Sequence, residues 1–503
     1  MIIIEILAFS QYLFYKDGNL EMTKRQRNWV MASLLLASIM SGLDATIINT
    51  ALPAIISDLH GIQYMGWIVA VFLLGMAVFS PLWGKLGDRI GNKKAFGLSI
   101  LIFIISSMIE GTAGNIWVFI IARTFMGIGA GGMGSIPYII LAQLYRNIHR
   151  RSQGLAYISA AWSGATIIGP LVGGWIVDTL SWHWVFYINL PIGIITILIL
   201  NVFFKEQVEV IQTPFDYRGS VFLIIGLAFA LMGIQLLGMV AWEWIVGLLL
   251  IGGILLILFW KNEQQVNDPI IPTHLFKSSK LVKDLVIFAL AWGGTISFSI
   301  YAPMWAQGLL AMTALVGGMT QIPGSIFDFV GSQLTHSFRR KIGDQNTITL
   351  ALVIAFLAPL GMLCSKVNAG IGWICFFSIF YGFGVGVIFN ILQIKVQQDV
   401  DHRDVGIATS VSYLIRILAQ TFMSSIYGVI MNMALARGVR PTHGKITVAM
   451  MDKLSDSATV HELPAHLLPQ MRMILHSGLQ DIMLVSCGLL VIAIGYNLLK
   501  KTD

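Results

Sequence analysis

Long apolar runs recur along the whole chain, and they constrain its fold more than any other feature of the sequence. A helix of about 18 to 20 apolar residues crosses the roughly 30 Å hydrocarbon layer of a bilayer. Such a helix also satisfies its own backbone amides, which lipid cannot do. The chain is 56% hydrophobic and only 11% charged, whereas soluble domains have about 25% charged residues. The sequence therefore predicts an all-α, polytopic membrane protein.

Apolar windows predict fourteen transmembrane helices. The tenth is interrupted by Pro323, and the seventh and eighth are separated only by the short stretch G-M-V-A-W-E-W. The predicted spans lie at about 29–52, 64–84, 95–113, 116–143, 154–177, 184–204, 219–239, 242–260, 283–307, 312–337, 346–364, 371–394, 405–434 and 480–499.

Lys and Arg gather in alternate loops, which predicts the orientation because cytoplasmic loops are rich in these residues. One such loop holds Lys85, Arg89, Lys93 and Lys94, whereas the short loops on the other side hold only Lys366. Both termini are therefore expected in the cytoplasm, with the protein in the cell membrane. The sizeable loop 435–479 is then outside, since long loops cross the membrane regardless of charge.

The first residues read M-I-I-I-E-I-L-A-F-S, an apolar stretch that is too short to span a bilayer. It has no basic region before it and no cleavage site, so it is not a typical signal peptide. Met22 is followed at once by T-K-R-Q-R and the first span. We interpret residues 1–21 as an upstream extension within an N-terminal cytoplasmic segment, 1–28.

No motif indicates an enzyme, a metal or a cofactor. The stretch H-E-L-P-A-H at 461–466 is one residue longer than the zinc signature H-E-x-x-H and contains Pro464, so its histidines do not share a helix face. There is no phosphate loop and no nucleophile set, so direct use of ATP is not expected, and energy would have to come from an ion gradient or from a substrate's own gradient. The three cysteines are expected to be free thiols. Basic residues are dispersed between spans, which argues against nucleic acid.

Charged residues inside the predicted spans need an explanation, because each costs about 2.5–3.5 kcal/mol to insert. They are Asp44, Glu110, Arg123, Asp328 and Arg416. Ion pairs between helices would account for them, and for Arg416 this interpretation stays open. Asp44 and Asp328 have no base within two turns of their own span, so each must find a partner elsewhere or face water. Such carboxyl groups can carry protons in exchange for substrate.

The loop G-K-L-G-D-R-I-G-N-K-K at 84–94 resembles the signature between helices 2 and 3 of the major facilitator superfamily. Gly84, Asp88, Arg89 and Gly91 match it. We expect Gly84 and Gly87 to permit close helix packing and Asp88 to cap the next helix or pair with a base. Asn92 stands where the family usually has Arg.

Three further stretches are similar to this superfamily, and in particular to its fourteen-helix drug:proton antiporters. L-D-A-T-I-I-N-T-A-L-P at 43–53 and L-S-W-H-W-V-F-Y-I-N-L-P-I-G at 180–193 look like that family, with His183 replacing its usual Arg. The stretch at 164–175 resembles the antiporter signature of exporters. Its matching residues are Gly164, Gly169, Pro170, Gly173 and Gly174. The second half is weaker, with a degraded loop signature at 331–341.

The resemblance implies two six-helix bundles, 29–204 and 283–503, with two inserted helices at 219–260 and alternating access around a midplane site. It implies proton coupling by Asp44 and Arg123 and substrate binding by Asp44, Glu110 and Asp328. The expected function is proton-coupled export of lipophilic, often cationic, toxic compounds by a monomer. Export of an endogenous peptide, siderophore or metabolite, and a non-transporting membrane sensor, are the alternatives.

Gly127, Gly129 and Gly132 satisfy the pattern G-x-G-x-x-G of dinucleotide-binding loops. They lie in the middle of an apolar run, with no strand before them and no free helix N-terminus after them, so they are not a nucleotide site. Gly127 and Gly131 are in G-x-x-x-G register, which is typical of helices that pack backbone to backbone. We predict a hinge-like contact beside Arg123.

Overall fold

The computed structural model describes residues 22–145, 148–206, 216–266, 269–401 and 404–499, so the interpretation of residues 1–21 lies outside it. This part of the chain is helical and has no strand. Its helices are α2 (Lys24–Asp58), α3 (Met65–Ile90), α4 (Asn92–Gly111), α5 (Ile116–Leu144), α6 (Ile148–Thr179), α7 (Trp184–Tyr187), α8 (Asn189–Phe203), α9 (Tyr217–Gln235), α10 (Trp242–Glu263), α11 (Ser279–Met304), α12 (Ala314–Met319), α13 (Ile322–Ile342), α14 (Asp344–Leu363), α15 (Ile371–Gln398), α16 (Val405–Val439), α17 (Val448–Leu454) and α18 (Leu468–Leu499).

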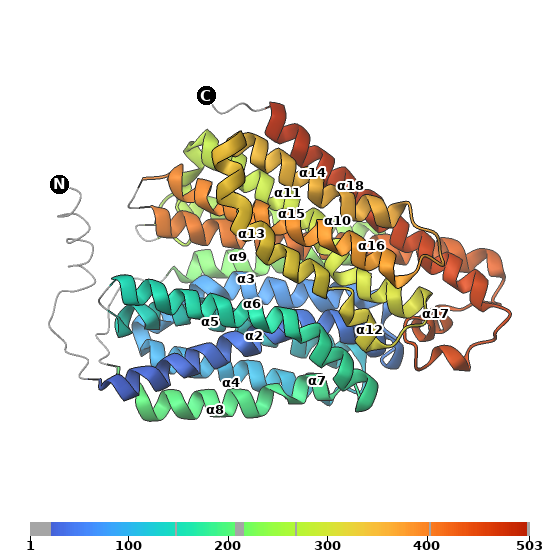
Figure 1. Cartoon of the computed structure of the whole chain (residues 1–503), viewed down its shortest axis with the longest axis horizontal. Helices are drawn as coiled ribbons and strands as arrows, with labels where there is room; N and C mark the ends of the chain where they lie inside the picture. The colour runs from blue at the N-terminus through green and yellow to red at the C-terminus, as the bar shows by residue number, and fades with distance from the viewer. Residues whose placement is uncertain (1–21, 146–147, 207–215, 267–268, 402–403, 500–503) are drawn as a thin grey trace.

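The long helices form two groups that run along a common axis (Figure 1). In the first group, α2 packs on α6, and α5 packs between α3 and α4. In the second, α15 packs between α13 and α14, and α11 packs on α16 and α18. One end of the molecule carries the first and last described residues, and we call it the terminus end. The opposite end carries α17, and we call it the α17 end.

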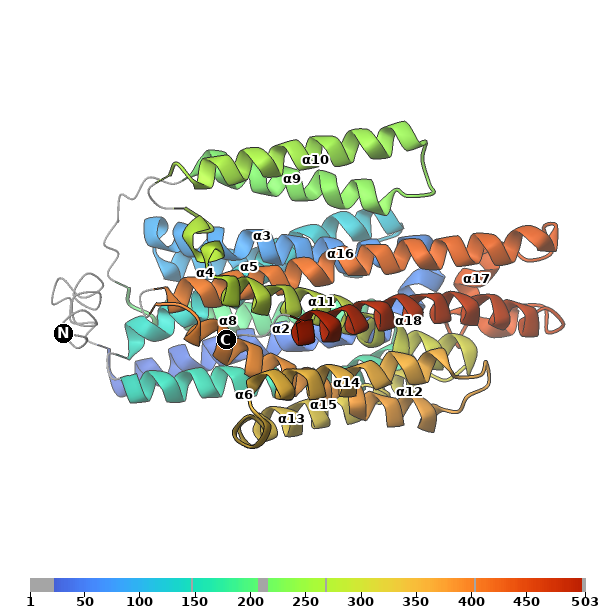
Figure 2. The same cartoon turned by 90° about the horizontal axis from the view of Figure 1, so that it is seen from above.

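α9 and α10 form a hairpin beside the two groups (Figure 2). α9 contacts α16 and α3, whereas α10 packs mainly on α9. The outer side of α10 is apolar and exposed, as Trp244, Leu250 and Ile257 illustrate. Such a surface is stable when lipid covers it.

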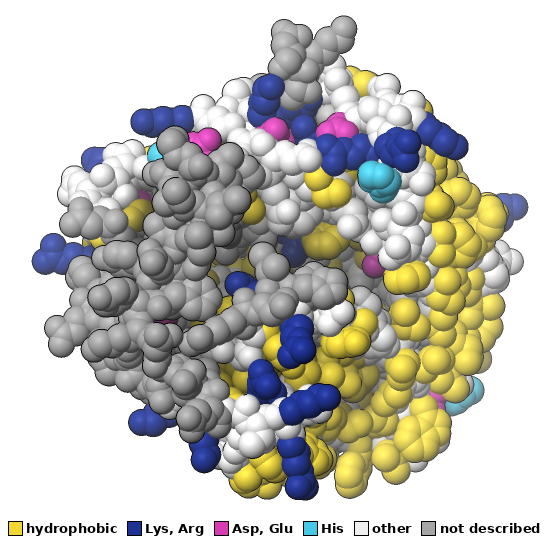
Figure 3. All heavy atoms as spheres, turned by 60° about the vertical axis from the view of Figure 1, so that its left-hand side comes forward, with side chains coloured by type: hydrophobic (Ala, Val, Ile, Leu, Met, Phe, Trp, Pro, Cys, Tyr) yellow, Lys and Arg dark blue, Asp and Glu magenta, His cyan; other side chains and the backbone are white. Residues whose placement is uncertain are grey.

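The surface divides into a charged end and an apolar side (Figure 3). Lys and Arg side chains gather at the terminus end, next to a nearly continuous hydrophobic face. Within the described residues, 13 helical segments are long and apolar enough to cross a membrane. The chain is therefore a multi-pass membrane protein.

The predicted tenth span, 312–337, is two helices in the structure. α12 ends at Met319, and α13 begins at Ile322 with Pro323 in its first turn, where the missing amide proton costs nothing. α13 is more polar than the other long helices and is not among the 13 apolar segments. It nevertheless packs along α15 inside the second bundle.

The predicted loop 435–479 is shorter than the sequence suggested. α16 continues to Val439 and α18 begins at Leu468, so only 440–467 connects them. Apolar windows missed these helix ends because Arg437 and Arg472 interrupt them. The helical period persists, however, since Met471, Leu475 and Leu479 are all buried. An ion pair between Arg437 and Asp481 joins the two extensions.

Hydrogen bonds join the two bundles near the α17 end. The Asn49 side-chain amide donates to the Ser299 hydroxyl at 3.2 Å, and the Gln307 amide donates to the Thr50 carbonyl at 3.1 Å. The connection between α16 and α18 adds another, because Asp452 accepts from the Ile62 backbone amide at 2.9 Å. These bonds close the molecule at this end.

Asp178 also joins the bundles. Its two carboxylate oxygens accept from the backbone amides of Ala314 and Leu315, each at 2.9 Å, at the start of α12. A carboxylate there is favoured because the first amides of a helix lack intrahelical partners.

Candidate functional site

Three of the charged residues predicted from the sequence meet inside the first bundle. Asp44 on α2, Glu110 on α4 and Arg123 on α5 come from separate helices. Arg123 Nη1 lies 3.3 Å from Asp44 Oδ2 and 3.4 Å from Glu110 Oε2. One guanidinium nitrogen therefore serves both acids. We call these residues the buried trio.

The buried trio is sealed from solvent, with exposed fractions of 4% for Asp44, 0% for Glu110 and 1% for Arg123. The Phe72 ring on α3 lies 4.2 Å from the Arg123 guanidinium carbon, a cation–π distance. Arg123 Nη1 also lies 3.4 Å from the Met126 sulfur. Neither Phe72 nor Met126 was predicted, because nothing in the sequence marks an apolar residue as the neighbour of a charge.

The buried trio contains one more acid than base. Glu110 Oε1 and Arg123 Nε have no hydrogen-bond partner, so the network is only partly satisfied. Like charges that share a buried site favour protonation of one of them. One added proton makes this group neutral, and its loss leaves one net negative charge.

Glycines bring α5 close enough to α3 and α4 for the buried trio to form. A Cβ at Gly127 would overlap the Phe72 carbonyl oxygen, and a Cβ at Gly131 would lie 2.9 Å from the Met76 carbonyl oxygen. Both glycines of the predicted G-x-x-x-G pair thus face α3. Gly129 and Gly132 instead face Phe103 and Ser99 on α4. The glycine-rich stretch packs α5 against two neighbours at once.

The loop at 84–94 lies at the terminus end, where Gly91 has a φ of 91° that favours glycine. Arg89 Nη1 donates to the Tyr217 hydroxyl at 2.7 Å, which ties α3 to α9. The carboxylate of Glu206 accepts from the backbone amides of Asn92 and Lys93, each at 2.8 Å. Glu206 therefore caps α4, a role that the sequence had suggested for Asp88.

Gly84 is not part of a close helix contact of the predicted kind. A Cβ at Gly84 would meet only the Ile139 side chain, at 3.8 Å. Asp88 is exposed. Close helix packing at Gly84 was therefore a wrong expectation.

The predicted antiporter signature in α6 contacts both bundles. Gly169 and Gly173 face Thr46 and Ile47 on α2. A Cβ at Gly174 would overlap the backbone of Leu315 on α12. In turn, a Cβ at Gly318 of α12 would overlap the Pro170 carbonyl oxygen. A Cβ at Gly164 would meet no described atom within 4 Å, so this glycine has no packing role of this kind.

Asp328 and Arg416 lie in the second bundle and do not join the buried trio. Asp328 is exposed, its backbone packs against Gly386 on α15, and it has no ion-pair partner among the described residues. Arg416 has no ion pair within this part of the chain either. Four aromatic rings surround it instead: those of Phe288, Trp292, Phe389 and Tyr413.

A further charged group in the second bundle was not predicted. Lys395 Nζ lies 3.5 Å from Asp284 Oδ2 and 3.6 Å from Asp399 Oδ2 near the terminus end. Asp284 is fully buried. Lys395 and Asp399 stand beyond the predicted end of their span, and Asp284 is the second residue of another, so none of the three was singled out as an intramembrane charge.

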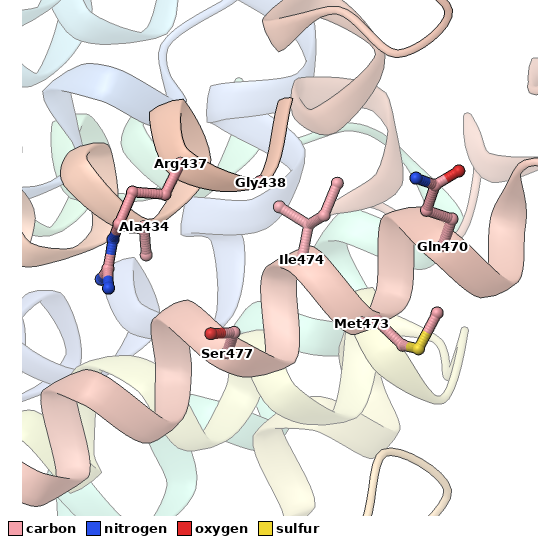
Figure 4. A pocket seen from close by; sticks show the side chains of 7 residues that line it. All are labelled: Ala434, Arg437, Gly438, Gln470, Met473, Ile474 and Ser477. Atoms are coloured by element: carbon pink, nitrogen blue, oxygen red, sulfur yellow. The ribbon is translucent and has the colours of Figure 1, made fainter. Parts of the chain in front are cut away.

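Two surface pockets lie away from these residues. One is between α16 and α18 at the α17 end, lined by Arg437, Gln470 and Ile474 among others (Figure 4). The other, of about 500 Å³, lies at the terminus end, where Lys24, Arg27 and Arg150 line it. Within the described residues, no three His, Cys, Asp or Glu side chains cluster in a way that could hold a metal ion.

Comparison with known proteins agrees with this architecture. The chain is 32% identical over 419 residues to the multidrug transporter protein MdtP of Bacillus subtilis, covering 81% of this chain and 76% of that protein. It is 29% identical over 407 residues to multidrug resistance protein 3 of the same organism, covering 80% and 79%.

Solved structures share the fold at low identity. A bacterial homologue of the human lysosomal transporter Spinster, in an inward-facing and unoccupied conformation, matches with a TM-score of 0.66, 15% identity and coverage of 95% of this chain and 97% of that one. An auto-inhibited peptide transporter of the POT family matches with a TM-score of 0.64, 15% identity and coverage of 95% and 98%. Residues 34–424 match the Major Facilitator Superfamily. The chain belongs to that superfamily.

Proposed function

We propose that this chain is a proton-coupled antiporter that exports hydrophobic, often cationic, toxic compounds by alternating access of its two bundles. The observation that carries the proposal is the buried trio of Asp44, Glu110 and Arg123. Because it holds two acids and one base at 3.3 and 3.4 Å, one proton switches it between neutral and net negative. Such a switch is what coupling to a proton gradient requires.

The relatives support the choice of substrate class. Two bacterial proteins at 29% and 32% identity are named as multidrug resistance or multidrug transporter proteins. We assign the chain to the fourteen-helix drug:proton antiporters, with α13 as the span beyond the 13 apolar segments. Asp328, which is exposed and has no basic partner among the described residues, is the proposed contact for a cationic substrate.

Orientation follows from the charges at the terminus end, which we place in the cytoplasm. The α17 end is then outside. The hydrogen bonds that Asn49 and Gln307 donate, and those that the Asp178 carboxylate accepts, would keep the outer side closed in this conformation. Export would require these bonds to break while contacts form at the terminus end.

Transport in proteoliposomes tests the proposal. With a pH gradient imposed, the wild-type protein is expected to accumulate ethidium against its concentration gradient, and Asp44→Asn is expected to abolish the accumulation. Asp481→Asn is the matched control, because this carboxylate pairs with Arg437 outside the buried trio. Proton-driven accumulation that survives in Asp44→Asn contradicts the coupling role, and no transport of any compound in a broad panel contradicts drug export.

A further inference from the structure

Arg416 is a charged side chain in the interior of α16 for which the protein provides no counter-ion. No carboxylate lies within 4 Å of it among the described residues, and only two tyrosines, Tyr138 and Tyr413, interact with it electrostatically. The cost of placing an arginine in a span is about 2.5–3.5 kcal/mol on insertion scales. Some other group must offset that cost.

Aromatic rings offset part of it. The guanidinium carbon of Arg416 lies 4.8 Å from the Phe389 ring centre, 5.3 Å from those of Trp292 and Tyr413, and 5.9 Å from that of Phe288. These are cation–π distances. Rings contact the faces of a guanidinium, however, and cannot accept the strong hydrogen bonds of its five N–H groups.

The N–H groups of Arg416 are not completely enclosed by the protein. They make no hydrogen bond to any described residue, and none of its nitrogens is among the buried atoms that lack a partner. The side chain is half-buried. A cation that is surrounded by rings, lacks an acceptor and remains accessible is a binding group whose acceptor comes from outside the protein.

The accessible side of Arg416 faces the first bundle. Tyr138 of α5 is exposed and lies close enough to interact with Arg416 electrostatically. The Tyr413 hydroxyl lies 3.6 Å from the position that a Cβ at Gly134 of α5 would take. Two tyrosines, one from each bundle, thus approach the same space as Arg416.

We infer that Arg416, Tyr138 and Tyr413 form an anion-binding subsite between the bundles, and that it takes organic anions with an aromatic body. The guanidinium would bind a carboxylate or a similar oxyanion, and the exposed ring of Tyr138 and the partly exposed ring of Phe389 would contact the apolar body of the ligand. The inference rests on the proposed export function, which supplies a pathway between the bundles, and it extends the substrates beyond lipophilic cations.

A matched pair of ligands tests the subsite without any mutation. Binding of 2-naphthoate and of neutral 2-naphthamide to the purified full-length protein would be measured by isothermal titration calorimetry. The two compounds share a ring system and differ in charge. We expect the wild type to bind naphthoate at least tenfold more tightly, as for a charge-assisted hydrogen bond of about 1.5–3 kcal/mol. Equal affinities would overturn the proposal.

Variants then test whether Arg416 causes the preference for naphthoate over naphthamide. Arg416→Gln is expected to bind both compounds equally, and Arg416→Lys to retain part of the preference. Arg437→Gln is the matched control, since Arg437 lies on the same helix α16 but pairs with Asp481 at the surface. A tenfold preference that survives in Arg416→Gln would place the anion elsewhere and overturn the assignment.

The readouts for the subsite and for the proposed function are separate. Calorimetric binding needs no proton gradient, whereas the role of Asp44 is measured as proton-driven flux. If flux does not depend on Asp44, the preference for naphthoate can still be present. If that preference is absent, flux can still depend on Asp44. Each experiment therefore overturns only its own claim.

Discussion

Arg123 in the first bundle and Arg416 in the second both lie inside membrane-spanning helices, but they differ in what neutralises their charge. Arg123 is 1% exposed and has two carboxylates within 3.4 Å. Arg416 is half-buried, has four rings around it and has no carboxylate partner among the described residues. The first bundle keeps both signs of charge inside the protein. The second leaves a cation whose counter-charge must arrive from outside.

The difference teaches that a charged side chain paired inside the protein and one that binds a ligand need different surroundings. In the buried trio, removal of one member leaves the others desolvated and unpaired, which is expensive. Around Arg416 the contacts are aromatic rings and no carboxylate pairs with it among the described residues, so its removal leaves no charged partner unpaired. Removal of Arg416 should therefore impair function with little loss of stability, whereas removal of Arg123 should impair both.

The largest effect is expected for Arg123→Ala. It leaves Asp44 and Glu110 buried with no base, so we expect unfolding to become easier by about 3–5 kcal/mol and transport to be lost. Thermal unfolding in detergent and ethidium efflux from vesicles measure the two effects. Adding Asp44→Asn and Glu110→Gln to the same chain should restore most of the stability but none of the transport. A stable, active Arg123→Ala would break the comparison.

Gly127→Leu tests whether the buried trio depends on helix packing rather than charge alone. The new side chain would collide with the Phe72 carbonyl oxygen and push α5 from α3. Overpacking of this kind costs about 1–3 kcal/mol, and we expect transport to fall with it. Gly164→Leu is the control because its position has no described atom within 4 Å. Equal thermal stability of the two variants would contradict the packing role.

Arg416→Gln tests the second arginine of the comparison. It removes cation–π contacts worth about 0.5–1 kcal/mol each at exposed sites but leaves no buried charge unpaired. The four rings share one guanidinium, so their contributions do not add, and we expect a loss of stability of about 1 kcal/mol, well below that of Arg123→Ala, as measured by thermal unfolding in the same detergent. If the two arginine variants lose the same stability, the second arginine also has an internal counter-charge.

The smallest effect concerns Asp452, which joins the bundles at the α17 end. Burial raises the pKa of Asp452 from 3.8 to about 6, although the Ile62 amide and His60 oppose the rise. A raised pKa means that its stabilisation is complete below pH 3.8 and is lost as pH rises through about 6. The unfolding midpoint should therefore rise by about 2 °C as the pH falls from roughly 7.5 to 5.

Asp452→Asn is the matching variant, because an amide oxygen can still accept from Ile62. Its unfolding midpoint should depend less on pH than that of the wild type over the same range. Asp481→Asn, at the surface of the same end, should leave the wild-type dependence in place. An Asp452→Asn variant with the full wild-type slope would assign the pH dependence to another group.

Much of the fold could be predicted because apolar length is a local property of the sequence. The spans of the first six helices agree with the structure within a few residues at most ends. The exceptions have physical causes. The buried residues of α13 are Gly324, Gly331 and Thr335, and its last turn is basic, so its apolar signal is weak. α18 begins a dozen residues early because Arg472 interrupts the apolar window without interrupting the helix.

The charged residues of the site could be predicted, but their partners could not. Insertion cost singled out Asp44, Glu110 and Arg123 one by one, whereas their meeting point depends on how three helices pack. The same limit applies to Gly129, which faces α4 while Gly127 faces α3. For Asp178, its place at the edge of a span gave no indication that it caps a helix of the other bundle.

The contact between α6 and α12 has a consequence for how the protein responds to temperature. At Gly174 and Leu315, and again at Pro170 and Gly318, the two bundles meet through backbone atoms. Heat capacity changes when apolar surface is exposed, and peptide groups change it in the opposite direction. Separation at this contact therefore releases little apolar surface. The enthalpy of opening at this contact should therefore change little with temperature, and a van't Hoff plot of the balance between closed and open forms should be close to a straight line.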